Sequence, residues 1–177
     1  MNLPATLTFP APVAPVVGAQ SYLLLVTGWR EWPPDRQTDI TDVLDRIWSE
    51  LIRDTAPPGV TLPPEWTAIV PTGPLLVVMH GDSPGGGVDH YADQWANEHP
   101  DELVVAERQS AEAARFGQGP GRYLKRNSHM VARLRAHVTD GGPGSWLAFP
   151  GNSNGTVDCL LKATRAGLPG TVIPYTE

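Results

Sequence analysis

Hydrophobic and polar residues follow two different spacings along the chain. Short continuous apolar runs, such as residues 22–27, are typical of strands that are buried on both faces of a parallel sheet. Between such runs, apolar residues recur every three or four positions, as in residues 40–51, and this spacing predicts amphipathic helices. Glycines and prolines separate the segments. The pattern therefore predicts alternating strands and helices from residue 22 onward.

Five strands and four helices are expected. The strands are predicted at residues 22–27, 75–80, 103–106, 146–149 and 171–174. The apolar helix faces are Ile40, Val43, Leu44, Ile47, Trp48 and Leu51, then Val88, Tyr91, Ala92, Trp95 and Ala96, then Met130, Val131, Leu134 and Val138, and finally Val157, Leu160 and Leu161. Thr38 or Asp39 is the candidate cap of the first helix, and Gly167 ends the last.

This succession predicts an α/β fold, a Rossmann-like open parallel sheet with helices on both faces. We expect the strand order 3-2-1-4-5. Strands one and four are then neighbours, and the chain leaves them in opposite directions. A crevice opens beyond the carboxyl ends of such a pair, and ligands bind there in open α/β sheets.

Composition adds the domain organisation. The 177 residues include 18 glycines and 19 prolines, so many turns interrupt short regular elements. The length fits a single domain over residues 21–177, preceded by a proline-rich arm at 1–20. A second proline-rich stretch at about 54–74 is too long for a simple connection and predicts an edge element or a lid. The low charged fraction, 18%, leaves room for an oligomer interface.

Charge and cysteine usage exclude several classes of protein. A net charge of −6 disfavours non-specific binding to nucleic acid, so any anionic ligand must be held locally. The single cysteine, Cys159, excludes an internal disulfide and a cysteine-based zinc cluster, and it fits a cytoplasmic protein. Prolines break the apolar segment 1–20, which is expected to be neither a signal peptide nor a membrane span. No metal or other cofactor is predicted, because His80 has no second ligand at metal-binding spacing.

Glycine-rich loops follow strands one, two and four. Glycine lets backbone N–H groups approach a ligand, and a helix that begins beside such a loop favours negative charge. Two sites at one crevice, each with a glycine-rich loop that leads into a helix, favour a phosphate or a nucleotide as ligand. Neither a Walker-type motif nor a G-x-G-x-x-G after the first strand is present, which excludes ordinary ATPases and dehydrogenases.

Several side chains near these loops have two open interpretations. Arg30 could bind phosphate while Trp29 or Trp32 stacks on a base, or Trp32 could pack against a helix while Arg30 caps carbonyls. Asp89 and Asp158 stand near helix starts, where a carboxylate either stabilises the helix or accepts bonds from ribose hydroxyls.

Three further expectations concern basic residues and histidine. Arg126 and Asn127 are expected to open the third helix and to reach the crevice. Arg133 and Arg135 are expected on a solvated face. His80, at a strand end, is expected to be a satisfied core histidine.

Four motifs in this order resemble the YspA/YpsA-related branch of the SLOG superfamily. They are Thr27-Gly28-Trp29-Arg30-Glu31-Trp32, His80-Gly81 through Gly87-Val88-Asp89, Arg126-Asn127, and Pro150-Gly151 through Gly155-Thr156-Val157-Asp158. The branch typically carries G-S-R-x-W, H-G-x-x-x-G-A-D, G-P-x-R-N and P-G-G-x-G-T-x-D. The resemblance covers residues 22–174. It implies a Rossmann-like fold, a bound nucleotide derivative such as ADP-ribose, and pairing of two copies through helices.

The chain also departs from these patterns. Trp29 replaces a small residue, one position is added before Asp89, and Tyr123-Leu124-Lys125 lengthens the spacing before Arg126. The related LOG enzymes cleave the N-glycosidic bond of nucleoside monophosphates and carry a glutamate three residues after the threonine. Cys159 stands at that position here.

The sequence is therefore compatible with three functions. The leading one is a sensor or binding module for a phosphorylated nucleoside or nucleotide derivative. Its candidate ligand-binding residues are Gly28, Trp29, Arg30, Trp32, Gly81, Gly85, Gly86, Gly87, Asp89, Asn127, Pro150, Gly151, Gly155 and Thr156. The alternative is a LOG-like hydrolase in which Arg126 holds phosphate and Asp158 stabilises the oxocarbenium-like charge. The third is a structural or interaction protein with a vestigial pocket. The partner is expected to be a small molecule, in a homodimer.

Overall fold

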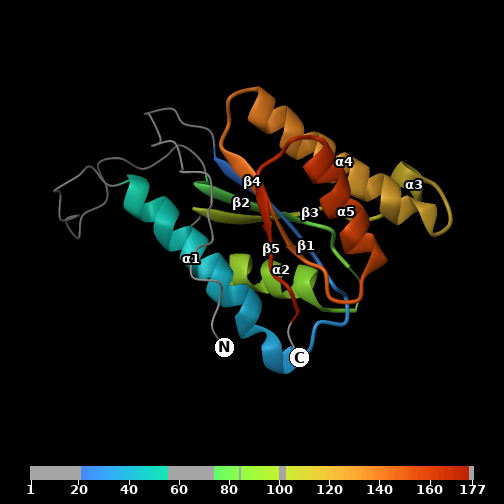
Figure 1. Ribbon diagram of the computed structural model, residues 1–177, viewed down its shortest axis with the longest axis horizontal. Helices are drawn as coiled ribbons and strands as arrows, with labels where there is room; N and C mark the ends of the chain where they lie inside the picture. Colours follow the sequence, from blue (N-terminus) through green and yellow to red (C-terminus); the bar gives the residue numbers. More distant parts are fainter. Residues whose placement is uncertain (1–20, 56–73, 84, 100–102, 176–177) are drawn as a thin grey trace.

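The protein folds around one five-stranded, all-parallel sheet (Figure 1). The structure is a computed structural model that describes residues 21–55, 74–83, 85–99 and 103–175. The strands are β1 (Tyr22–Gly28), β2 (Leu76–His80), β3 (Val104–Arg108), β4 (Gly144–Phe149) and β5 (Gly170–Val172). Their order is β3-β2-β1-β4-β5, which confirms the predicted fold class and strand order.

Helices cover both faces of this sheet (Figure 1). They are α1 (Thr38–Thr55), α2 (Val88–Glu98), α3 (Ala113–Phe116), α4 (Gly121–Thr139) and α5 (Asn154–Arg165), with a short 3-10 helix η1 (Pro34–Arg36) before α1. The proline-rich arm at 1–20 and residues 56–73 of the predicted insertion lie outside the described residues. Among the described helices, none combines the length and apolar character that a membrane crossing requires.

The central strand β1 shows why the sheet is covered on both sides. Leu24 and Val26 belong to a core cluster with α1 and α2, whereas Leu23 and Leu25 belong to a second cluster with α4 and α5. Alternate residues of a strand point to opposite faces, so a continuous apolar run gives two buried faces. The chain leaves β1 toward α1 and leaves β4 toward α5, and the crossover point of the fold lies between these two strands.

The start of α4 differs from the prediction. The helix begins at Gly121, so Arg126 and Asn127 lie in its second turn and do not open it. Pro120 precedes it with φ −67° and ψ −25°, a conformation that suits the start of a helix. The short helix α3, which precedes α4, is not among the four predicted helices.

The buried face of α5 also differs from the prediction. Thr156, Cys159 and Ala163 face the sheet, while Val157 and Leu161 are 40% and 43% exposed. The expectation that Val157 and Leu161 face the core was therefore wrong. Small side chains on the inner face allow the helix to approach the sheet closely.

The start of α1 shows a smaller difference. Its first turn includes Thr38 and Asp39, which had been expected to cap it, because η1 leads directly into the helix. Asp39 pairs there with Arg36 at 2.6 Å.

Candidate ligand-binding site

The loops that follow β1, β2 and β4 meet at the carboxyl edge of the sheet. The N–H of Trp29 donates to the carbonyl of Phe149 at 2.9 Å, and the N–H of Val88 donates to the carbonyl of Trp29 at 3.2 Å. A side chain at Gly151 would place its Cβ 2.5 Å from the Trp29 indole, and Gly151 has φ +44°. The close contact and the backbone conformation both require glycine there.

The glycine loop between β2 and α2 approaches the β1 loop in the same way. A Cβ at Gly87 would lie 2.2 Å from the carbonyl oxygen of Arg30, and Gly87 has φ +73°. Gly85 and Gly86, also at positive φ, have open space where a Cβ would stand. The loop is therefore packed against β1 at one end and open at Gly85 and Gly86.

Three arginines converge beside this loop, and we call Arg30, Arg122 and Arg126 the arginine cluster. Arg30 Nε donates to Ser83 Oγ at 3.2 Å, Arg126 donates to the carbonyl of Gly81, and Arg122 donates to the Tyr123 hydroxyl at 3.0 Å. These acceptors are all neutral. Within the described parts of the chain, no carboxylate forms an ion pair with any of the three.

The Tyr123 phenol reports the positive field of the arginine cluster. The hydrogen bond from Arg122 lowers its pKa, and the charges of Arg122, Arg30 and Arg126 lower it further. A pKa shift in this direction means that the surroundings favour a negative charge. An anion at this edge would therefore meet three guanidinium groups, which come from the β1 loop and from α4.

A buried carboxyl group lies under the same loop. Asp89, in the first turn of α2, is 6% exposed, and its carboxylate accepts a hydrogen bond from the backbone N–H of Ser83. Burial raises its pKa, while His80, Arg126 and the hydrogen bond from Ser83 oppose that effect. Asp89 thus holds the glycine loop from inside, next to the arginine cluster.

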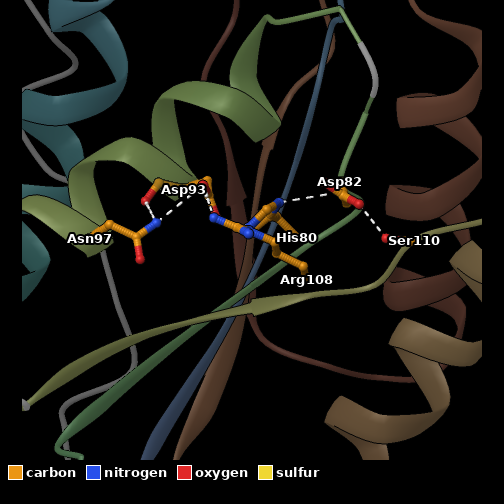
Figure 2. Close-up of polar contacts among 6 residues, drawn as sticks. All are labelled: His80, Asp82, Asp93, Asn97, Arg108 and Ser110. Carbon is orange, nitrogen blue, oxygen red and sulfur yellow. Dashed lines mark hydrogen bonds and ion pairs between the residues drawn. The ribbon is translucent and has the colours of Figure 1, made fainter.

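A polar network around His80 shapes the start of the loop (Figure 2). His80 is 1% exposed, and its Nδ1 accepts the N–H of Asp82 at 3.2 Å. Nε2 must then carry the proton, and it donates to Asp93 Oδ1 at 3.1 Å. The Asp82 carboxylate accepts a bond from Ser110. The expectation of a satisfied core histidine is confirmed.

The carboxylate of Asp93 joins this network to β3. Arg108 donates to both of its oxygens, at 2.6 and 2.7 Å, and Asn97 donates to it at 3.1 Å (Figure 2). The hydrogen bond from Arg108 lowers the pKa of Asp93. Residues from β2, β3 and α2 therefore fix the backbone at Asp82, a non-glycine residue with φ +48°.

Asn127 and Asp158 join α4 to α5. The buried Asn127 amide donates to the carbonyl of Gly155 at 2.9 Å and to Asp158 Oδ2 at 3.1 Å. Lys162 Nζ donates to the same carboxylate oxygen at 2.7 Å. Asp158 therefore already holds two donors, and its side chain is 27% exposed.

The first turn of α5 is organised by Ser153. Its hydroxyl oxygen accepts the Thr156 N–H at 3.3 Å and the Thr156 hydroxyl at 3.0 Å, which caps the helix. Thr156 is 2% exposed, so its hydroxyl faces inward. Cys159 is fully buried, and burial raises the pKa of its thiol to about 12. Cys159 is therefore a protonated thiol in the core.

The two tryptophans of the β1 loop have different surroundings. Trp32 is 2% exposed and packs edge-on against Phe149 and Tyr175, at centroid distances of 5.5 and 5.2 Å. Its burial fits the packing alternative. Trp29 is half-buried and lines a surface hollow of about 510 Å³ together with Pro150, Gly151, Asn152, Pro174 and Tyr175.

Four residues at this edge were missed from the sequence: Ser83, Arg122, Tyr123 and Ser153. Arg122 lies four residues before Arg126, so the two share one face of α4. That spacing would have indicated the pair if the helix had been predicted from residue 121. Ser83 and Ser153 gave no sequence signal beyond their glycine-rich surroundings.

Comparison of the chain with models of known protein families, with curated proteins and with solved structures found no match. Across the residues that the structure describes, no group of three or more His, Cys, Asp or Glu side chains could hold a metal ion.

Proposed function

We propose that this protein binds a phosphorylated nucleoside or nucleotide derivative at the carboxyl edge of its sheet, as a sensor or binding module. The arginine cluster is the observation that carries the proposal. Guanidinium groups make strong, charge-assisted hydrogen bonds to phosphate, and bidentate contacts add geometric specificity. In a chain of net charge −6, three such groups around one phenol form a local site for an anion.

Two further features support a nucleotide as the ligand. The glycine loop after β2 is open at Gly85 and Gly86, where backbone N–H groups can approach a phosphate. The loops that follow β1 and β4 meet this glycine loop at the same edge, and open α/β sheets bind ligands at such a crossover point. The resemblance to the SLOG superfamily points to the same ligand class.

Hydrolysis of an N-glycosidic bond is less well supported. Asp158 is held by Asn127 and Lys162, and the buried thiol of Cys159 cannot supply the negative charge of a glutamate. Base released by the wild-type protein and abolished in Asp158→Asn, with affinity unchanged, would favour the hydrolase, because an interaction made mainly in the transition state affects turnover and spares binding.

Calorimetry tests the proposal directly. The protein is titrated with AMP, ADP-ribose, cyclic ADP-ribose and NAD, and each mixture is then analysed by chromatography. Ligand recovered intact supports a sensor. We expect Arg30→Ala to weaken binding by about 1.5–3 kcal/mol, since it removes a charge-assisted donor. Arg135→Ala, which removes an exposed arginine of α4 that lies outside the arginine cluster, is the matched control and should change little. Equal losses in both variants would contradict a specific contact.

We also propose a homodimer that pairs through α4 and α5. Leu124, Val157 and Leu161 are 40–47% exposed on these neighbouring helices, and Lys162 bonds the Leu124 carbonyl across them. An exposed group of large apolar side chains favours association. Light scattering at micromolar concentration should give twice the chain mass, and Leu161→Glu should give the monomer. A wild-type monomer would remove the proposal.

A further inference from the structure

The hollow beside Trp29, which we call the aromatic hollow, lies next to the proposed anion site. Six residues line it, and two of them, Trp29 and Tyr175, are aromatic. None of the six carries a charge. Its volume of about 510 Å³ is within the range of small-molecule sites, roughly 300–1,000 Å³. An uncharged, partly aromatic wall suits a flat, uncharged ring.

Trp29 is held in place before any ligand arrives. Its N–H donates to Phe149 O, its ring lies against Gly151, and Tyr175 contacts it edge-on at a centroid distance of 5.6 Å. An aromatic side chain that is already fixed loses little conformational entropy when a ring stacks on it. The SLOG motif that this loop resembles has a small residue at this position, so a wall formed by Trp29 is a departure from that motif.

One wall residue can also read the edge of a ring. Asn152 is exposed, and its amide has no hydrogen-bond partner among the described residues. An amide offers both donors and an acceptor, which matches the mixed edges of heterocyclic bases. A purely hydrocarbon ligand would leave these groups unused.

The aromatic hollow and the arginine cluster lie on opposite sides of one loop. Trp29 contacts Gly151 and Tyr175, on the side of β4 and β5, whereas Arg30 contacts Ser83, on the side of β2. The two residues are consecutive. A ligand with a ring at one end and phosphate at the other would therefore cross the loop from Trp29 to Arg30.

We propose that the aromatic hollow binds the nucleobase of the ligand, so that the base lies over β4 and β5 and the phosphate lies at the arginine cluster. This assignment rests on the proposed function and adds the direction in which the ligand lies. It predicts that the ring contributes to affinity separately from the phosphate. Stacking of a base on an aromatic side chain changes affinity by about tenfold.

The test compares AMP, ribose 5-phosphate and adenosine by calorimetry. Wild type should bind AMP about tenfold more tightly than ribose 5-phosphate. It should bind adenosine only weakly, because adenosine has no phosphate. Trp29→Leu, which keeps an apolar side chain against Gly151, should weaken AMP about tenfold and leave ribose 5-phosphate unchanged. Asn152→Ala changes an exposed side chain without disturbing packing, and it should weaken AMP alone, by a smaller factor.

The control is Trp48→Leu, the same substitution at a half-buried tryptophan of α1, which should change neither ligand. If wild type binds AMP and ribose 5-phosphate equally, or if Trp29→Leu and Asn152→Ala leave AMP affinity intact, the base does not occupy the hollow, although the proposed function stands. If wild type binds neither phosphate compound, the proposed function itself fails, and this assignment fails with it.

Discussion

At the residue scale, two glycines of the candidate site differ in what surrounds them. A Cβ at Gly28 would lie 2.3 Å from the side chain of Val88, which is fully buried. A Cβ at Gly81 would lie 2.4 Å from the guanidinium of Arg126, the far end of a flexible side chain. The first neighbour cannot move without disturbing the core, whereas the second can.

Alanine at these positions should separate stability from binding. Gly28→Ala should lower the free energy of unfolding by about 1–3 kcal/mol through overpacking. Gly81→Ala should cost less than about 1 kcal/mol but displace Arg126 and weaken an anionic ligand. Urea denaturation and calorimetry with AMP measure the two effects. If Gly81→Ala destabilises as strongly as Gly28→Ala, Arg126 is a structural support and not a ligand group.

The single thiol provides a second prediction at this scale. Cys159 is fully buried, and with a pKa of about 12 roughly one thiol in ten thousand would be ionised at pH 8. The native protein should therefore not react with Ellman's reagent, and denatured protein should show one thiol per chain. Rapid labelling of the native protein would show that α5 opens readily and would contradict the buried position.

At the element scale, Asn127 supplies buried hydrogen bonds between α4 and α5. Asn127→Ala removes the donor to Gly155 O and one donor to Asp158 in a buried place, so it should lower the free energy of unfolding by about 1–3 kcal/mol. Lys162→Met removes a partly exposed ion pair with Asp158 and an exposed hydrogen bond to the Leu124 carbonyl, and it should cost less than about 1 kcal/mol. Denaturant titration of both variants gives the comparison. A larger loss from Lys162→Met would reverse the assignment.

The elements also show what the sequence could and could not predict. All five strands were found in the predicted places, with bounds shifted by one or two residues, and the face of α2 was correct. The apolar run of β1 and the full set of buried positions on α2 leave few alternatives. The buried face of α5 was predicted wrongly, because Val157 and Leu161 are apolar but exposed, whereas small residues form the buried face. Apolar character alone does not distinguish a core face from an exposed one.

At the scale of the whole molecule, the candidate site could be predicted in part. Its glycine loops follow strands, and the strand order brings their carboxyl ends together, so Gly28, Gly87 and Gly151 could be placed at one edge. Arg30 and Arg126 were expected near this edge one by one, but their contacts with Ser83 and Gly81, and the contact of Tyr175 with Trp29, could not be predicted. These three contacts each span more than 25 positions, and local spacing carries no information about such contacts.

Two carboxyl groups of α2 should give the whole protein opposite pH dependences. Burial raises the pKa of Asp89, whereas the hydrogen bond from Arg108 lowers the pKa of Asp93. A lowered pKa adds stability at pH values above the pKa of the same group in the unfolded chain, about 3.9. That stability is lost as the pH falls through the pKa of the folded protein. A raised pKa has the reverse effect, because the folded protein then holds its proton longer than the unfolded chain, and stability falls as the pH rises through the folded pKa.

Asparagine at each position should reveal both effects. Asp89→Asn should raise the free energy of unfolding at pH 7, with a gain that shrinks toward pH 4, while Asp93→Asn should lower it at pH 7, with a loss that shrinks in acid. Urea denaturation between pH 3 and pH 8 measures both, and each variant is the control for the other. If Asp89 also accepts bonds from a ribose, the stabilised variant should bind ribose ligands less tightly than wild type and leave their deoxy analogues unaffected, a stability gained at the cost of function. A loss of stability in Asp89→Asn at pH 7 would show instead that Arg126 and the N–H of Ser83 outweigh burial, and that this carboxylate is a structural part of the loop.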